Sequence, residues 1–164
     1  MPLIIDHVGI LTPKIEHLAS ILTSMTEFSG VEPVVEDPYH SARIQFLSSP
    51  NKSFPRLELI EPMGGESPLN GGLERGGGPH HICFQVASVE SIDDWCRKAS
   101  IRKVFGPNPA PAFGDGREVV FVHAPGLGLV EFVSTQDADD IHEFNTVSAA
   151  PLIKSFLAQR KRSL

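Results

Sequence analysis

The segment "HHICF" (residues 80–84) matches the segment "DHVGI" (residues 6–10), and this match decides the fold class. In each copy, a short apolar strand is followed by apolar residues at helical spacing. These residues are Ile15, Leu18, Leu22 and Met25 in the first copy and Val89, Ile92, Cys96 and Ala99 in the second. The offset between the copies is the same for strand and helix, so the sequence predicts two similar structural units.

A second pair of segments extends the duplication to the end of each unit. "RLELIEP" (residues 56–62) matches "GLVEFVS" (residues 128–134) and aligns Glu58 with Glu131. Each unit is therefore predicted to contain a strand, a helix and three further strands, an α+β arrangement of two βαβββ modules. The expected ranges are 3–10, 14–28, 31–36, 42–48 and 56–61, then 79–87, 89–99, 101–105, 117–123 and 128–134.

The segments outside the two modules differ in composition from the modules. The glycine-rich segment 63–78 reads as a loop with one helical turn near 68–74. After Thr135 the chain becomes acidic, and 151–164 has the pattern of an amphipathic helix with a basic end. We predict one domain at 1–135, with modules at about 3–62 and 79–134, and a helical tail at 136–164 that could cap the fold or mediate a homodimer.

Composition narrows the class of partner. The chain has 164 residues, of which 41% are hydrophobic and 21% charged, which suits a single globular domain with a core. Its net charge of -6 argues against nucleic-acid binding, which requires a basic surface. The sequence contains no apolar run near the roughly 20 residues of a membrane span, so no membrane partner is expected. With two cysteines, the chain fits the cytoplasm, with the mitochondrion and the peroxisome left open.

Each module carries one histidine and one glutamate, at opposite ends and both on predicted strands. The four residues are His7, Glu58, His81 and Glu131. Burying an ionised carboxylate on an otherwise apolar strand is costly unless another charge compensates it. Two imidazole nitrogens and two carboxylate oxygens suit an octahedral divalent transition ion with positions left for substrate, so these residues are metal-ligand candidates at a catalytic site. His80 alternates to the opposite face and is expected to be structural.

Longer motifs resemble a known superfamily. "IDHVGI" (5–10), "LELIEPMGGESPL" (57–69), "GGGPHHICFQV" (76–86), "VVFVHAP" (119–125) and "GLVEFV" (128–133) resemble the vicinal oxygen chelate superfamily, which includes glyoxalases, bleomycin resistance proteins and dioxygenases. Within it, the closest resemblance is to the methylmalonyl-CoA epimerase family. The resemblance implies that the two modules form a curved, barrel-like mixed sheet around a metal cleft.

The same resemblance implies a mechanism. His7, Glu58, His81 and Glu131 would hold one divalent ion per chain (cobalt, nickel, manganese, zinc or iron), and the ion would polarise a substrate carbonyl or a pair of vicinal oxygens. The ion would stabilise the enolate formed when a base removes the adjacent proton. Glu131 is the first candidate for that base, and Glu58 is its counterpart on the opposite face.

Three further residues are predicted to contact substrate. Some epimerases place a second glutamate base on the third strand, and alignment of "IQFLSSP" puts Gln45 near that position, where an amide cannot act as a base. Arg117 and His123 share a predicted strand face and could contact an acidic substrate. The first helix also lacks the aromatic pair and the "LG" common in these families. These departures leave room for a specialised metabolite as substrate.

We therefore expect a divalent-metal-dependent epimerase or isomerase that uses metal-stabilised enolate proton transfer, similar to methylmalonyl-CoA epimerase. A glyoxalase I-like lactoylglutathione lyase is the first alternative, because it uses a similar ligand set. A ring-cleaving dioxygenase is the second, although Glu58 would fill a position which that chemistry needs. A non-enzymatic ligand-binding protein is the third.

Overall fold

The computed structural model describes residues 4–50, 52, 54–99 and 101–135. The strands and helices follow the order predicted for two βαβββ modules. The first module contains β1 (Ile4–Leu11), α1 (Ile15–Met25), β2 (Gly30–Val31), β3 (Val35–Asp37), β4 (Ala42–Ser48) and β5 (Arg56–Pro62). After α2 (Asn70–Glu74), the second contains β6 (Gly78–Val86), α3 (Ser91–Ala99), β7 (Arg102–Pro109), η1 (Pro111–Phe113), β8 (Glu118–Ala124) and β9 (Gly128–Ser134).

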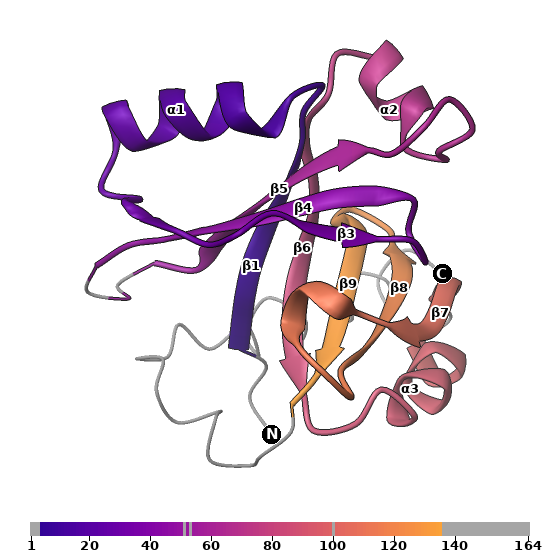
Figure 1. Ribbon diagram of the computed structural model, residues 1–164. Helices are drawn as coiled ribbons and strands as arrows, with labels where there is room; N and C mark the ends of the chain where they lie inside the picture. Colours follow the sequence, from indigo (N-terminus) through magenta and orange to yellow (C-terminus); the bar gives the residue numbers. More distant parts are fainter. Residues whose placement is uncertain (1–3, 51, 53, 100, 136–164) are drawn as a thin grey trace.

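All the strands described belong to one mixed, curved sheet, with the order β2-β4-β5-β1-β6-β9-β8-β7 and with β3 paired to β4. The pairing is the same in both modules, because β1 is parallel to β5 and β6 is parallel to β9. The modules join where β1 and β6 run antiparallel at the centre of the sheet (Figure 1). The predicted α+β fold with duplicated modules is confirmed.

Each long helix covers the outer face of its own module. On α1, Ile15 and Ala19 pack with Leu47 and Leu59, and Ile15, Leu47 and Leu59 are fully buried. On α3, Ile92 and Cys96 pack in the same way with apolar residues of β6, β8 and β9. Since strand side chains alternate between faces, the neighbours of Leu59 and Phe132, which are Glu58 and Glu131, face the inside of the curve.

The boundaries differ from the predictions where proline intervenes. The predicted strand 31–36 is divided into β2 and β3, because Pro33 has no N–H to donate to a ladder. Predicted strand 101–105 extends to Pro109, and η1, which was not predicted, lies beside β3 of the other module. The helical turn expected near 68–74 is α2. The predicted tail at 136–164 lies outside the described residues.

Among the described helices, none combines the length and the apolar character that crossing a bilayer requires.

Candidate metal centre

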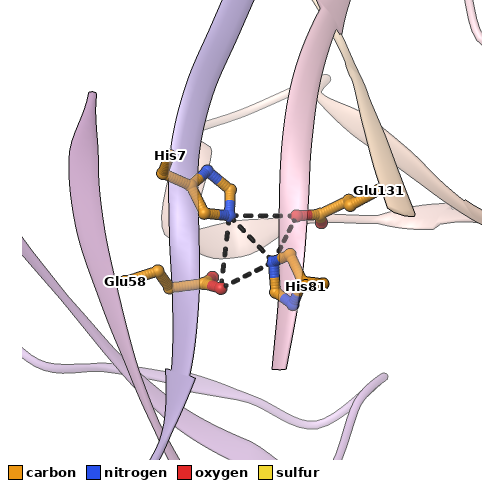
Figure 2. Close-up of side chains that lie close together, drawn as sticks. All are labelled: His7, Glu58, His81 and Glu131. Carbon is orange, nitrogen blue, oxygen red and sulfur yellow. Dashed lines mark hydrogen bonds and ion pairs between the residues drawn. The ribbon is translucent and has the colours of Figure 1, made fainter. Parts of the chain in front are cut away.

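Four neighbouring strands bring the two histidines and two glutamates together at the centre of the sheet. His7 lies on β1, Glu58 on β5, His81 on β6 and Glu131 on β9, and all four side chains point toward one another (Figure 2). Each residue is at most 5% exposed. The structure thus unites the four ligand candidates that the duplication predicted, two from each module. We call them the quartet.

Distances within the quartet are short and uniform. His7 Nε2 lies 3.3 Å from Glu58 Oε2 and 3.0 Å from Glu131 Oε2, and His81 Nε2 lies 3.2 Å and 3.0 Å from the same two atoms. The two Nε2 atoms are 3.0 Å apart. Adjacent ligands of one ion, each bound at about 2.1 Å, are separated by about 3 Å, so the quartet has the spacing of a coordination shell.

Two further observations fit a cation. Apart from their ion pairs with the two histidines, the buried Oε2 atoms of Glu58 and Glu131 have no hydrogen-bond partner among the described residues. All four ligand atoms lie within 4.8 Å of one another. Buried oxygens of this kind are costly unless a positive charge meets them. Oxygen and imidazole donors in this combination suit a divalent transition metal rather than calcium or magnesium.

The pKa shifts of the four residues also fit a positive charge at the centre of the quartet. Burial alone would raise the pKa of Glu58 and Glu131, but the charges of His7 and His81 outweigh it and hold both pKa values below the usual range. Burial alone would lower the pKa of the two histidines. Electrostatic interaction with Cys83 and Glu58 raises the pKa of His7 instead. Electrostatic interaction with Glu131 raises the pKa of His81. A divalent ion would take the place of these protons.

Asp6 holds the first histidine in position. His7 Nδ1 donates to Asp6 Oδ1 at 2.9 Å, which leaves the Nε2 lone pair directed at the quartet. Arg56 and Gln85 also donate to Asp6, at 2.7 Å and 2.6 Å. Burial opposes ionisation of Asp6, but the bond from His7 and the charge of Arg56 outweigh it, and the pKa of Asp6 is well below its usual range.

His80 has the matching place beside the second histidine. The Nδ1 atoms of His80 and His81 are 3.0 Å apart, so one ring donates and the other accepts. Burial and the charge of His81 lower the pKa of His80 to about 4, so its ring is neutral near pH 7. A neutral His80 can accept from His81 Nδ1–H and leave His81 Nε2 directed at the quartet. His80 was expected on the face opposite His81, but it lines the same cavity as His81 and lies where it can orient that ligand candidate.

The quartet lies at the wall of a cavity of about 380 Å³ between the two modules. Glu58, His81 and Glu131 contribute to its lining, together with aromatic side chains such as Phe113 and Phe121. Phe113 comes from η1, and its ring lies 5.5 Å from the ring of His7. A small-molecule site of this kind combines apolar walls with a few polar groups that converge at one point.

The three predicted substrate contacts lie apart from the quartet. Gln45 is directed to the helix-covered side of the sheet and donates to the carbonyl oxygen of Glu32 at 2.9 Å, because Ile44 and Phe46 occupy the inner face. Arg117 donates to the carbonyl oxygen of Ser134 at 2.6 Å and lines a separate depression. His123 is exposed on β8 and does not line the cavity. The structure therefore does not bring these three to the cavity.

The sequence interpretation missed Asp6 and the specific role of His80. Asp6 precedes a ligand histidine, and alternation would send its side chain to the other face. A register shift between Ile5 and His7 in the β1–β6 ladder breaks that alternation. The Nδ1 contacts of both ligands are thus supplied by the residues that immediately precede them in the sequence.

Comparison with known proteins gives a consistent result. Residues 6–121 match the model of a family described as the glyoxalase/bleomycin resistance protein/dioxygenase superfamily. An ethylmalonyl-CoA/methylmalonyl-CoA epimerase of Cereibacter sphaeroides is 31% identical over 73% of this chain and 87% of its own. The mitochondrial methylmalonyl-CoA epimerase of Mus musculus is 28% identical over 77% of this chain and 68% of its own.

Solved structures show the same fold. A Streptomyces coelicolor methylmalonyl-CoA epimerase variant, in complex with 2-nitronate-propionyl-CoA, aligns with a TM-score of 0.69 at 22% identity. The alignment covers 84% of this chain and all of the other.

Proposed function

The chain belongs to the glyoxalase/bleomycin resistance protein/dioxygenase superfamily, and we propose that it is a divalent-metal-dependent epimerase acting on a methylmalonyl-CoA-like thioester. The observation that carries this proposal is the quartet, in which two imidazoles and two carboxylates converge beside an apolar cavity. The relatives named as epimerases supply the substrate class. Epimerisation at the carbon next to a thioester carbonyl requires removal and return of one proton, and we assign this step to the residues beside the cavity.

In this proposal His7, Glu58, His81 and Glu131 hold the ion, and a bound divalent ion supplies Lewis-acid polarisation of a carbonyl oxygen. Glu131 is the proposed base, since its carboxylate is ionised and buried beside the cavity. Glu58 is the counterpart for the opposite face. Asp6 and His80 orient the two histidines. Phe113 and Phe121 exclude water from the carbanion form of the substrate, which bulk water would otherwise protonate on either face.

The cavity suits the acyl end of the proposed substrate. Its walls include Ile44, Ile60, Leu129 and the two phenylalanines, all apolar. A short branched acyl group can be buried there with its carbonyl near the quartet. The nucleotide part of coenzyme A is too large for a cavity of about 380 Å³ and would extend outside it.

The alternatives make different demands on the site. A glyoxalase I-like lyase could use the same quartet, so it must be separated by substrate. A ring-cleaving dioxygenase would keep two histidines and one carboxylate as ligands, whereas Glu58 lies within 3.3 Å of His7 as a fourth. A non-enzymatic binding protein would have no need for two buried carboxylates in register with two histidines.

The first test is metal content. The chain, purified without a metal-affinity tag, is measured by inductively coupled plasma mass spectrometry beside His81→Ala and Glu131→Ala. We expect about one transition metal per parent chain and a loss in both variants. No uptake of cobalt, nickel, manganese, zinc or iron by the parent would refute the proposed mechanism.

The second test is the reaction. The loaded parent is incubated with methylmalonyl-CoA in deuterium oxide, and separately with methylglyoxal and glutathione. Incorporation of deuterium next to the thioester carbonyl, with interconversion of the epimers, is the expected result. Formation of lactoylglutathione without exchange on the thioester would assign the lyase activity instead.

Location and assembly complete the proposal. Cys83 and Cys96 are both free thiols, which fits a reducing compartment, and we propose the cytoplasm. The mitochondrial name of the mouse relative keeps that organelle as the alternative. A homodimer is proposed for the full chain, and its mass in solution by light scattering will test it.

A further inference from the structure

We propose that His40, oriented by Asp37, is a second proton-transfer residue that acts on the substrate from a different wall of the cavity than Glu131. This inference rests on the proposed epimerase function and adds a catalytic residue to it. It assigns the opposite face to His40 in place of Glu58, because the carboxylates of Glu58 and Glu131 converge on the same point beside His7 Nε2 and leave Glu58 as a metal ligand.

The pair formed by His40 and Asp37 has the geometry of an acid–base dyad. His40 Nδ1 donates to Asp37 Oδ2 at 2.6 Å. Asp37 Oδ1 accepts the backbone N–H groups of Tyr39 and His40, at 2.9 Å and 3.1 Å. Asp37 is 1% exposed, so its carboxylate is held by three bonds in a buried position. A carboxylate on Nδ1 sets the tautomer, orients the ring and stabilises it when it is protonated.

The other nitrogen of His40 is available for chemistry. Nε2 is buried and has no hydrogen-bond partner among the described residues. Asp37 and His40 both line the cavity that Glu58, His81 and Glu131 line. A buried polar atom beside an apolar cavity is costly unless a group enters the cavity to meet it. His40 Nε2 is thus available as a hydrogen-bond donor or acceptor for a ligand in the cavity.

Aromatic contacts connect the dyad to the quartet through one shared ring. The ring of Phe121 lies 5.8 Å from the ring of His40 and 5.5 Å from the ring of His81, so both imidazoles flank one side chain. Phe105 lies 5.3 Å from His40 on the same wall. His40 follows β3 at the edge of the first module, whereas the quartet lies on the central strands. In the proposed arrangement, a substrate in the cavity meets Glu131 from the central strands and His40 from the β3 edge of the first module.

The proposed reaction transfers one proton on each side. The Glu131 carboxylate takes the proton from the carbon next to the carbonyl, and the C–H electron pair passes into the carbon–carbon bond of the enolate. The electrons return to the same carbon as His40, in its imidazolium form, delivers the Nε2 proton from the other side. The product has the opposite configuration, with Glu131 protonated and His40 neutral. Exchange with water restores both groups, and the reverse direction uses His40 as the base.

Separate epimers of methylmalonyl-CoA distinguish the two groups. Each epimer is incubated in deuterium oxide with metal-loaded parent, His40→Gln, Asp37→Asn and, as matched control, His17→Gln, which changes an exposed histidine on α1. We expect His40→Gln to lose interconversion by at least about 100-fold. It should still exchange the proton of the epimer that Glu131 deprotonates, at close to the parent rate, and lose exchange on the other epimer.

Asp37→Asn should weaken exchange on the same epimer as His40→Gln, because the ring loses its orienting carboxylate. Metal content near the parent value in both variants shows that the fold and quartet are intact. The inference is overturned by interconversion in His40→Gln within about twofold of the parent, or by equal loss of exchange on both epimers. A parent that exchanges neither epimer overturns the proposed function itself, and with it this inference.

Discussion

At the scale of the residue, the quartet restricts the size of its neighbours, and Gly9 is the clearest case. A Cβ atom built on Gly9 would lie 2.3 Å from Cε1 and 2.5 Å from Nδ1 of His81. The glycine is therefore required by space, since the imidazole of a ligand candidate lies directly against the β1 backbone.

Gly9→Ala should displace the His81 ring and weaken metal binding by at least about tenfold, an energy of about 1.4 kcal/mol. Titration with cobalt against a competing chelator will measure the affinity. Gly65→Ala is the control, because a Cβ atom there meets nothing within 4 Å. Equal affinity in the two variants would contradict the placement of His81.

Asp6→Asn should weaken metal binding by about 10–100-fold, because the carboxylate that orients His7 is lost. The substitution also leaves Arg56 without its buried charge partner, so a lower melting temperature is expected. The affinity is measured as above, with Asp93→Asn on the exposed surface of α3 as control. Parent-like affinity in Asp6→Asn would show that the negative charge of Asp6 has no part in metal binding.

Individual site residues differed in how far the sequence could predict them. The quartet was predictable because the duplication repeats each histidine and glutamate at one spacing. Asp6 aligns with His80 in that repeat, a residue of different chemistry, and His40 has no histidine counterpart. Their roles depend on a register shift and on a turn that no periodicity indicates. Gln45 was predicted from a proline-based alignment, and a shift of one residue along a strand is enough to reverse the face.

At the scale of the element, one face of β5 contributes to the core under α1 and the other face contributes to the quartet. Leu59 is fully buried and packs under α1, whereas Glu58 belongs to the quartet on the other face. The strands and long helices were predictable from this period and from helical spacing. The break between β2 and β3 and the turn η1 were harder to predict from the sequence, because they depend on proline and on contacts between modules.

Leu59→Ala should destabilise the fold by about 2–5 kcal/mol, since it leaves a cavity beneath α1. Metal stoichiometry of the folded variant should equal that of the parent, because Leu59 faces away from the quartet. Urea unfolding gives the free energy, and Ile21→Ala, at a position of α1 that is 38% exposed, is the control with an expected loss below about 1 kcal/mol. Similar losses in both variants would contradict the packing of α1 on β5.

At the scale of the whole molecule, the quartet is where the two modules meet. His7 and Glu58 come from the first module, His81 and Glu131 from the second, and the β1–β6 ladder joins the modules between them. A cation at the quartet is therefore bound by both modules at once, and it also compensates two carboxylates buried in each other's vicinity. Metal binding and the stability of the complete sheet should consequently be linked.

Metal should therefore raise the melting temperature of the chain. At a free metal concentration about 100 times the dissociation constant, binding adds about 2.7 kcal/mol to the free energy of unfolding. For a domain of this size that corresponds to roughly 5–10 °C. Calorimetry with cobalt and with chelator will measure the shift in the parent, in the pair variant His7→Ala/Glu58→Ala and in the pair variant His81→Ala/Glu131→Ala. Because each pair variant lacks the ligands of one module, both should lose the shift. Retention of the shift in either one would mean that a single module binds the ion without its partner.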